Sequence, residues 1–415
     1  MIHWDSLFEF DDPEKRVEEL LPHLKVESAA VLERALTGRE IGLKEALRLA
    51  SAQGEELAAL VATADLLRQR KVGEVISYVV CRNINFTNVC YVGCKFCAFS
   101  TGPNKPDAWN HSLEEVGRRA EEAWNRGATE ICMQGGLPRD MEPFYYRDLL
   151  RAIKSKVPRI HIHAYSPMEI VYGVELTGLP LKEYLLMLRA AGLDSIPGTA
   201  AEILDDRVRR VLSKNKLSVA QWQEVITTAH RLGIPTTSTM MYGHRENPGH
   251  WVRHMLLLRE MQKKTGGFTE FVPLGFVHQN TALYQQGLAR PGPTVEEHLR
   301  VHALARLLLN DAIPNIQVSW VKMGRKMAQL CLRSGANDFG GTLMEESISR
   351  LAGSQEGQII WPHEFRQLIE EIGRTPAERS TTYKILRSWP MDSKRWLSAI
   401  SGQPEETNVA SCVPA

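Results

Sequence analysis

The chain has 415 residues, of which 43% are apolar and 24% are charged, as in a soluble globular protein large enough to bury a substantial core. Its net charge of +1 argues against a nucleic-acid partner, and no apolar run approaches the roughly 20 residues needed to cross a membrane. Seven cysteines are too few for a disulfide scaffold, and Met1–Leu20 lacks the pattern of a signal peptide, so we expect a cytoplasmic protein.

The first part of the chain has helical periodicity. Apolar residues recur at helical spacing over Asp12–Gln69, with interruptions at Pro22 and Gly38. This pattern predicts an N-terminal helical layer over residues 1–75.

From Ile76 onward, short β-rich runs alternate with amphipathic segments of helix length. Eight strands separated by helices predict an α/β fold, a parallel (β/α)8 barrel of the TIM type over residues 76–350. The predicted strands are Tyr78–Asn88, Glu130–Gln134, Arg159–Ala164, Leu193–Ile196, Pro235–Tyr242, Glu270–Leu274, Ile316–Trp320 and Asp338–Gly341.

The last part of the chain, residues 351–415, is predicted to add a C-terminal helical segment and a tail. Residues Leu351–Ser388 read as helices punctuated by Pro and Gly, and Trp389–Ala415 as the tail.

Polar residues lie where the predicted strands end, which is where barrel enzymes place their active sites. In Arg159–Ala164 the alternation of a strand puts His161 and His163 on one face. Asn83, Asn85 and Thr87 share a face in the same way. These side chains are therefore expected to point into one barrel mouth.

The most informative motif follows the first strand. Cys90, Cys94 and Cys97 form a C-x3-C-x2-C run within eight residues. Thiolates are soft ligands that hold iron–sulfur clusters, normally four per cluster, so three would leave one iron with an open coordination site. Zinc sites usually pair a C-x2-C with a second distant pair, and ferredoxin spacing differs as well. We therefore expect these three residues to ligate a [4Fe–4S] cluster.

This spacing resembles that of radical S-adenosylmethionine (SAM) enzymes, and Asn83–Ser100 is similar to the subfamily that acts in the deazaflavin and futalosine pathways. Further blocks resemble the 4-hydroxyphenyl transferase family, which makes the precursor of the deazaflavin FO on the way to coenzyme F(420). The resemblance covers about Lys71–Leu386, with departures at Pro138-Arg139 and at Gln279–Ala282. The blocks are Thr129–Leu137, Ile160–Ile170, Ala191–Leu204, Thr236–Glu246, Gly266–Leu274, Asn315–Met323 and Gly335–Glu345.

The resemblance implies a reaction and its cofactors. The open iron would chelate the amino and carboxylate groups of the methionine part of SAM, and the resulting radical would start cleavage of the Cα–Cβ bond of L-tyrosine. The 4-hydroxybenzyl group would pass to 5-amino-6-(D-ribitylamino)uracil, releasing 2-iminoacetate. An electron donor and a separate ring-closing radical SAM enzyme are implied as partners, with neither nucleic acid nor membrane.

Individual residues are candidates for the roles in this reaction. His163, Asn337 and Asp338 would contact the reacting substrates, while Lys322 or Arg82 could pair with the tyrosine carboxylate or form a structural ion pair. The residues expected to bind the cofactors are Phe96, Gln134, Gly135, Gly136, Ser166, Glu169, Glu202, Gly243 and Glu246.

Three other functions remain open at this point. Dehypoxanthine futalosine cyclase, of menaquinone biosynthesis, shares the cysteine loop and much of the barrel. An iron–sulfur electron carrier and a zinc-binding interaction module would use the same cysteines without this catalysis.

Overall fold

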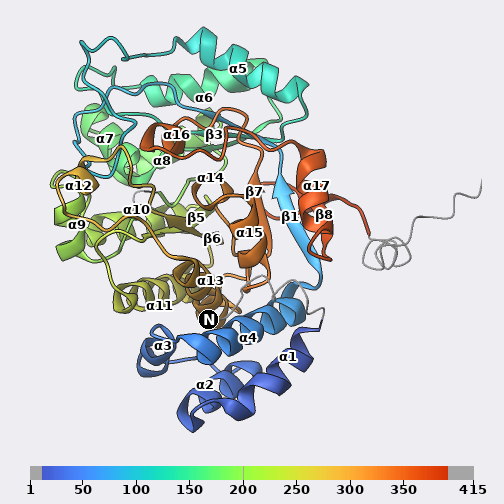
Figure 1. The fold of residues 1–415 in the computed structure, drawn as a ribbon. Helices are drawn as coiled ribbons and strands as arrows, with labels where there is room; N and C mark the ends of the chain where they lie inside the picture. The colour runs from blue at the N-terminus through green and yellow to red at the C-terminus, as the bar shows by residue number, and fades with distance from the viewer. Residues whose placement is uncertain (1–11, 200, 391–415) are drawn as a thin grey trace, which may run out of the picture.

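The computed structural model of the protein describes residues 12–199 and 201–390. Helices and strands alternate through most of this range, as Figure 1 shows. The strands are β1 (Val75–Val79), β2 (Cys81–Ile84), β3 (Glu130–Met133), β4 (His161–Ala164), β5 (Thr236–Tyr242), β6 (Phe268–Gly275), β7 (Asp338–Gly341), β8 (Thr375–Arg379) and β9 (Ile385–Ser388). The first helices are α1 (Pro13–Leu20), the 3-10 turn η2 (Leu21–His23), α2 (Val26–Leu36), α3 (Leu43–Leu49) and α4 (Gly54–Val72). The others are α5 (Leu113–Asn125), α6 (Tyr145–Lys156), α7 (Pro167–Thr177), α8 (Leu181–Ala191), α9 (Asp206–Leu212), α10 (Val219–Arg231), α11 (Pro248–Thr265), α12 (Ala282–Gln285), α13 (Val295–Leu309), α14 (Trp320–Met323), α15 (Arg325–Leu332), α16 (Ile348–Ala352) and α17 (Pro362–Glu370).

The strands close into the predicted parallel barrel. β1 and β2 together form its first strand, which pairs in parallel with β7 on one side and with β3 on the other. β3 pairs with β4, and β5 pairs with β6. Short parallel bridges supply the two remaining positions and join all eight into a ring: His163 to Ser195, Ile196 to Thr236, Phe271 to Ile316, and Gln317 to Asp338.

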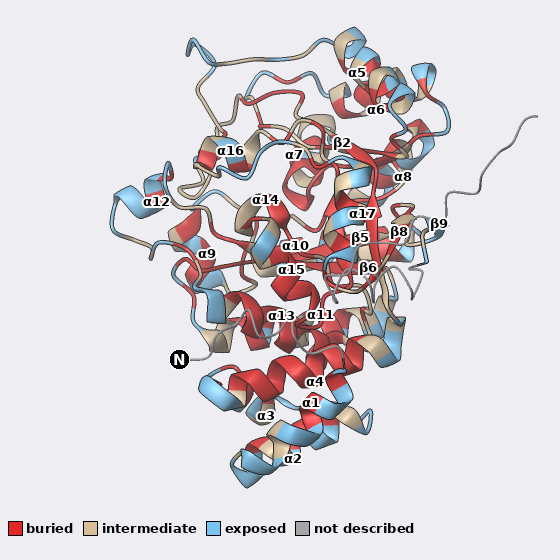
Figure 2. Ribbon diagram, turned by 45° about the vertical axis from the view of Figure 1, so that its right-hand side comes forward, coloured by how far each residue is buried: buried red, intermediate tan, exposed pale blue. Residues whose placement is uncertain are grey.

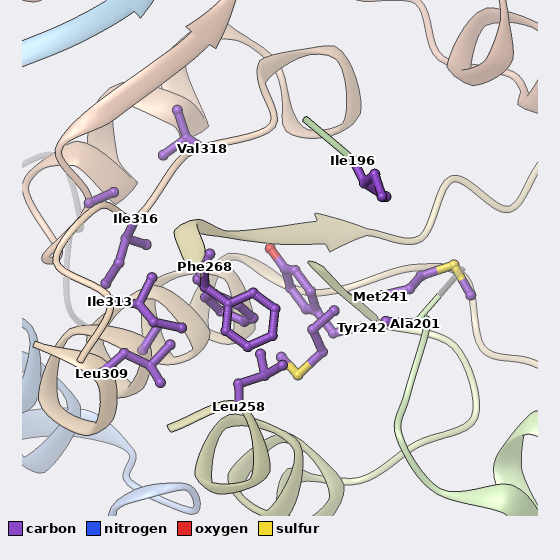
Figure 3. Packing of buried hydrophobic residues seen from close by; sticks show 14 of the residues in the cluster. Ile196, Ala201, Met241, Tyr242, Leu258, Phe268, Leu309, Ile313, Ile316 and Val318 are labelled. Carbon is purple, nitrogen blue, oxygen red and sulfur yellow. The ribbon is translucent and has the colours of Figure 1, made fainter. Parts of the chain in front are cut away.

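An apolar layer lies between the barrel strands and the surrounding helices. Figure 3 shows Tyr242 of β5 and Phe268 of β6 beside Leu258 of α11 and Leu309 of α13. The tyrosine and both leucines have less than 1% of their surface exposed. This burial of alternate strand residues against helices is the main apolar contribution to stability in a fold of this class.

The N-terminal helices form the predicted layer below the barrel, drawn in blue in Figure 1. α4 is buried along most of its length and packs against α13 and α1, as the red colouring of Figure 2 shows. Among the described helices, none is both long and apolar enough to span a membrane.

The prediction that residues 351–388 are helical is wrong in part. α17 is a helix, but residues 375–379 and 385–388 are the strands β8 and β9, an antiparallel pair. β8 also pairs in parallel with β1, from Val75 opposite Thr375 to Val79 opposite Arg379. The strand thus forms because the edge of β1 offers it backbone partners, a long-range interaction with no local periodicity in sequence. The predicted tail from residue 391 onward lies outside the described residues.

The hairpin formed by β8 and β9 brings charge to the N-terminal end of the barrel. Arg379 donates to both carboxylate oxygens of Asp338, at 2.5 and 2.9 Å, and lies 3.5 Å from Glu270. The hydroxyl of Tyr383 donates to the same glutamate. Because Asp338 begins its strand, this buried network forms a floor at the end of the barrel opposite the cysteine loop.

Candidate active site

The cysteine loop follows β2 and is fixed by backbone hydrogen bonds from several other loops. The amide of Tyr91 donates to the carbonyl of Leu137, 3.0 Å away, in the loop after β3. Lys95 donates to Leu212 at the end of α9 and accepts from Leu283 of α12, at 2.9 and 2.8 Å. Four segments from distant parts of the chain therefore converge at the C-terminal end of the barrel.

The three thiols have the chemistry that an iron–sulfur cluster requires. Cys90, Cys94 and Cys97 are all free and half-buried. Burial raises the pKa of Cys90 and of Cys94, while the ammonium of Lys216 acts in the opposite direction on both. Cys94 also lies 3.4 Å from the hydroxyl of Ser213. Soft, partly shielded thiols beside a cation fit an anionic thiolate cluster.

Binding a single metal ion would require several ligands that converge on one point. Within the described part of the chain, no group of three His, Cys, Asp or Glu residues is placed to hold one metal ion. In a four-iron cluster the thiolates bind separate irons and need not converge on one point. The spread of the three cysteines is therefore compatible with a cluster.

Beside the cysteines lies a buried ion pair that sequence reasoning found only in part. Glu202 was predicted as a cofactor ligand, and its carboxylate pairs with Lys216, which was not predicted. The Lys216 ammonium lies 4.6 Å from the centre of the ring of Phe96, the residue that lies between the last two cysteines in the sequence. Burial opposes both charges, yet their attraction raises the pKa of Lys216 and lowers that of Glu202. Lys216 belongs to the polar segment Ser213–Lys216. Nothing in this local sequence distinguishes it from an ordinary solvent-exposed lysine.

The double glycine after β3 is required by packing within the protein. A Cβ on Gly135 would lie 2.4 Å from the ring of Phe86, and one on Gly136 would lie 2.1 Å from the carbonyl oxygen of Val89. The amide of Gly136 donates to Thr87 at 2.7 Å. The glycines thus press this loop against the segment that leads into Cys90. Gln134, just before them, donates through its side chain to Thr199.

Ser166 and Glu169 form a capping box at the start of α7. One carboxylate oxygen of Glu169 accepts from the amide and the hydroxyl of Ser166, both at 2.7 Å, and the other accepts from the amide of Gly135 at 3.0 Å. Burial raises the pKa of Glu169 to about 7. This carboxyl therefore joins the loop after β3 to the helix after β4, and cofactor contact by either residue stays a prediction.

Glu246 organises the loop after β5. It accepts from the amides of Gly243 and His244, at 2.6 and 2.9 Å, and from the indole of Trp251 at 3.0 Å. The positive φ of Gly243, +92°, and the contact that a Cβ would make with Pro293 explain the glycine. These contacts show that both residues hold the loop in its conformation. Contact of either residue with the cofactor stays a prediction.

The predicted catalytic histidine lies inside the barrel. His161 and His163 point to the same side, as predicted, and each lies 2.7 Å from the hydroxyl of Ser195. Burial lowers the pKa of His163 to about 4, so its imidazole is neutral near pH 7.

Asn337 and Asp338, also predicted to be catalytic, are engaged in internal contacts. The side-chain oxygen of Asn337 accepts from Arg306 and from the amide of Ile316, at 2.8 and 2.9 Å. Asp338 belongs to the barrel floor with Arg379. These positions favour structural roles for both.

Of the two cations considered for the tyrosine carboxylate, Arg82 has protein partners. It pairs with Glu345 at 2.7 Å and with Glu122 at 3.1 Å. Lys322 lies elsewhere, in α14 beyond the seventh strand position, with its ammonium 2.9 Å from the hydroxyl of Ser349.

Two family models match the chain in succession. The model of the radical SAM superfamily matches residues 84–258, and that of the CofH/MqnC C-terminal region matches residues 265–392. The first match contains the cysteine loop, and the second contains α14, the barrel floor and the hairpin.

Named relatives are similar over most of the chain. The 5-amino-6-(D-ribitylamino)uracil–L-tyrosine 4-hydroxyphenyl transferase of Methanothermobacter thermautotrophicus is 48% identical over 87% of this chain and 98% of its own length. FO synthase of Mycobacterium leprae is 55% identical over 82% of this chain, but the match covers only 40% of that protein. The chain thus spans about two-fifths of the FO synthases that it matches.

Solved structures agree on the fold. Methylornithine synthase (PylB) aligns with a TM-score of 0.63 and 19% identity, over 84% of this chain and 97% of that one. The [FeFe]-hydrogenase maturase HydG aligns with a TM-score of 0.67 and 15% identity, over 95% of this chain and 85% of that one. At these identities the likeness shows the fold alone.

Proposed function

The chain belongs to the radical SAM family of the 5-amino-6-(D-ribitylamino)uracil–L-tyrosine 4-hydroxyphenyl transferase, and from this we propose that it is such a transferase in FO biosynthesis. It would cleave the Cα–Cβ bond of L-tyrosine, transfer the 4-hydroxybenzyl group to the diaminouracil and release 2-iminoacetate. The observation that carries this proposal is the cysteine loop held at the barrel mouth, in a chain that matches 98% of a relative named for this reaction.

The proposed cofactors are one [4Fe–4S] cluster, held by Cys90, Cys94 and Cys97, and SAM. Together these groups supply hydrogen-atom abstraction from a bound substrate when they are present. Lys216 would place positive charge next to the cluster thiolates, and Glu202 fixes the position of that charge. The half-buried setting of the thiols limits access of water, which protects radical chemistry from side reactions.

Polar groups around the mouth would orient the substrates. Asn85 donates to the carbonyl of Gln134 at 3.0 Å and accepts from Ser347 at 2.9 Å, which links the loops after β2, β3 and β7. The tyrosine phenol would help the cleavage because its ring delocalises an unpaired electron at the benzyl carbon. In the proposed reaction the chain would position two substrates while the cofactors carry the reaction.

Ring closure would belong to a separate catalyst. The match covers 98% of the transferase relative and 40% of the FO synthase of Mycobacterium leprae. We propose that a second radical SAM enzyme closes the ring of the product and that a separate electron donor reduces the cluster.

The test is an anaerobic incubation of cluster-loaded protein with SAM, dithionite, ring-labelled L-tyrosine and the diaminouracil. We expect the whole labelled hydroxybenzyl group on the uracil, with 5′-deoxyadenosine and glyoxylate formed from hydrolysed iminoacetate. A control lacking tyrosine should give no adduct. If the label stays in intact tyrosine, and a parallel incubation with dehypoxanthine futalosine gives its cyclised product, the alternative of futalosine cyclase activity is established and the proposal is rejected.

A further inference from the structure

Lys322 is a cation at the mouth of the barrel whose hydrogen bond is to a hydroxyl. It lies in α14, directly beyond the seventh strand position, and is half-buried. Its ammonium donates to the hydroxyl of Ser349 in α16, 2.9 Å away. Among residues 12–199 and 201–390, no carboxylate oxygen lies within 4.0 Å of that ammonium. Figures 1 and 2 both draw α16 far from the N-terminal helices, at the mouth end of the molecule.

Several buried cations around the barrel have carboxylate partners, whereas Arg300 and Arg306 donate to backbone carbonyls. Arg82 pairs with Glu345, Lys216 with Glu202, and Arg379 with Asp338. An ammonium removed from water without an anion loses solvation that nothing replaces. The hydrogen bond of Lys322 to the Ser349 hydroxyl supplies neither a carboxylate nor a carbonyl acceptor.

The two carboxylates whose charges act on Lys322 have other partners. Both carboxylate oxygens of Glu346 accept from the amide of Ser349, at 2.9 and 3.0 Å, at the start of α16. Glu202 is paired with Lys216. Burial lowers the pKa of Lys322, and the charges of Glu346, Glu202 and Cys97 act against that effect. Lys322 follows the seventh strand position and the cysteine loop follows the first strand, so both lie at the C-terminal end of the barrel.

We propose that Lys322 binds the α-carboxylate of the amino-acid substrate, L-tyrosine, and so selects a free amino acid at this site. This inference rests on the proposed function. In that scheme the methionine carboxylate of SAM is bound by the open iron, so the carboxylate left for a protein cation is that of tyrosine. A charge-assisted bond to a half-buried ammonium would also orient the amino group and Cα relative to the cofactor.

The test replaces Lys322 with Gln, which keeps a donor for Ser349 but removes the charge. K322Q should raise the KM for L-tyrosine about ten- to a hundredfold, the range expected for loss of a hydrogen bond to a charged group. The KM values for SAM and for the diaminouracil should stay within about twofold. Isothermal titration of the cluster-loaded protein with L-tyrosine, without reductant, should show the same loss of affinity.

A substrate lacking the carboxylate charge separates a direct contact from a structural one. Wild-type protein should prefer L-tyrosine to L-tyrosinamide, and K322Q should lose most of that preference. K322R should restore part of it, because arginine also pairs with carboxylates. R82Q serves as the matched control: it removes a cation with protein partners and should leave the preference unchanged.

The outcomes keep the two proposals apart. If K322Q contains normal iron and retains the wild-type preference for tyrosine over its amide, the inference is overturned while the transferase assignment stands. An increase confined to the KM for SAM would also overturn it, because the bound carboxylate would then be that of the cofactor. If wild-type protein forms no adduct from tyrosine at all, the proposed function itself fails.

Discussion

Glu169 shows how one side chain can link two loops of the site through contacts within the protein. Its two oxygens accept from Ser166 at the start of α7 and from Gly135 after β3, so the carboxyl fixes the relative position of two loops at the mouth. The local pattern Ser166-x-x-Glu169 predicts the cap, but only the fold reveals the third donor.

The buried carboxyl should also make stability depend on pH. Its pKa rises from 4.5 to about 7 on folding, so between these values the folded state binds more protons than the unfolded state. Stability from this group is fully present below about pH 4.5 and falls as pH rises toward 7. We expect the difference in unfolding free energy between E169Q and wild type to change by up to about 1.4 kcal/mol per pH unit across this window.

Denaturant titrations at pH 5, 6 and 7 measure that difference. Glu175 is exposed on the same helix, and E175Q provides the matched control, for which we expect no comparable slope. Parallel pH dependences for E169Q and wild type would contradict the assignment.

At the scale of elements, the loop after β3 supports the cysteine loop through close backbone contact. Gly136→Ala would place a methyl group 2.1 Å from the carbonyl oxygen of Val89, immediately before Cys90, so the two loops must separate. We expect G136A to keep its barrel by circular dichroism but to take up far fewer than the about four irons per chain of a complete cluster. Gly102→Ala is the control, because its Cβ would meet only the Lys105 side chain, at 3.7 Å. Equal iron contents in G136A and G102A would count against this role.

Sequence patterns predicted elements well where the information is local. The barrel strands are short β-rich runs between helices, and each of the eight predicted positions is found in the ring. Leu193–Ile196 and Ile316–Trp320 are present only as short bridges, and Trp320 begins α14 instead of ending a strand. The hairpin of β8 and β9 escaped prediction because β8 exists through pairing with β1, some 300 positions away in sequence. The same holds for the site. The cysteines could be predicted because their spacing is a local signal, whereas Lys216 is recognised only by its contacts with Phe96 and Glu202 in the folded chain.

At the scale of the whole molecule, the two ends of the barrel have different tasks. Loops at the C-terminal ends of the strands assemble the cysteines, the Lys216 ion pair and Lys322, while the opposite end is closed by Arg379, Asp338 and Glu270. The floor also ties the hairpin to β6 and β7. The buried ion pairs of this floor therefore contribute to stability. A catalytic role for Asp338 would have to act from the end of the barrel opposite the cysteine loop.

Arg379→Met tests this division. Removing the guanidinium leaves the Asp338 carboxylate buried without its partner, so we expect the free energy of unfolding to fall by about 3–5 kcal/mol. Adding D338N should recover part of the loss, because the neutral amide needs no counter-charge. Denaturant titration of the two single variants and the double variant measures the coupling. If Asp338 is structural, folded D338N will retain turnover of tyrosine with normal iron content; loss of turnover in a folded, iron-loaded D338N would instead restore the catalytic role predicted from sequence.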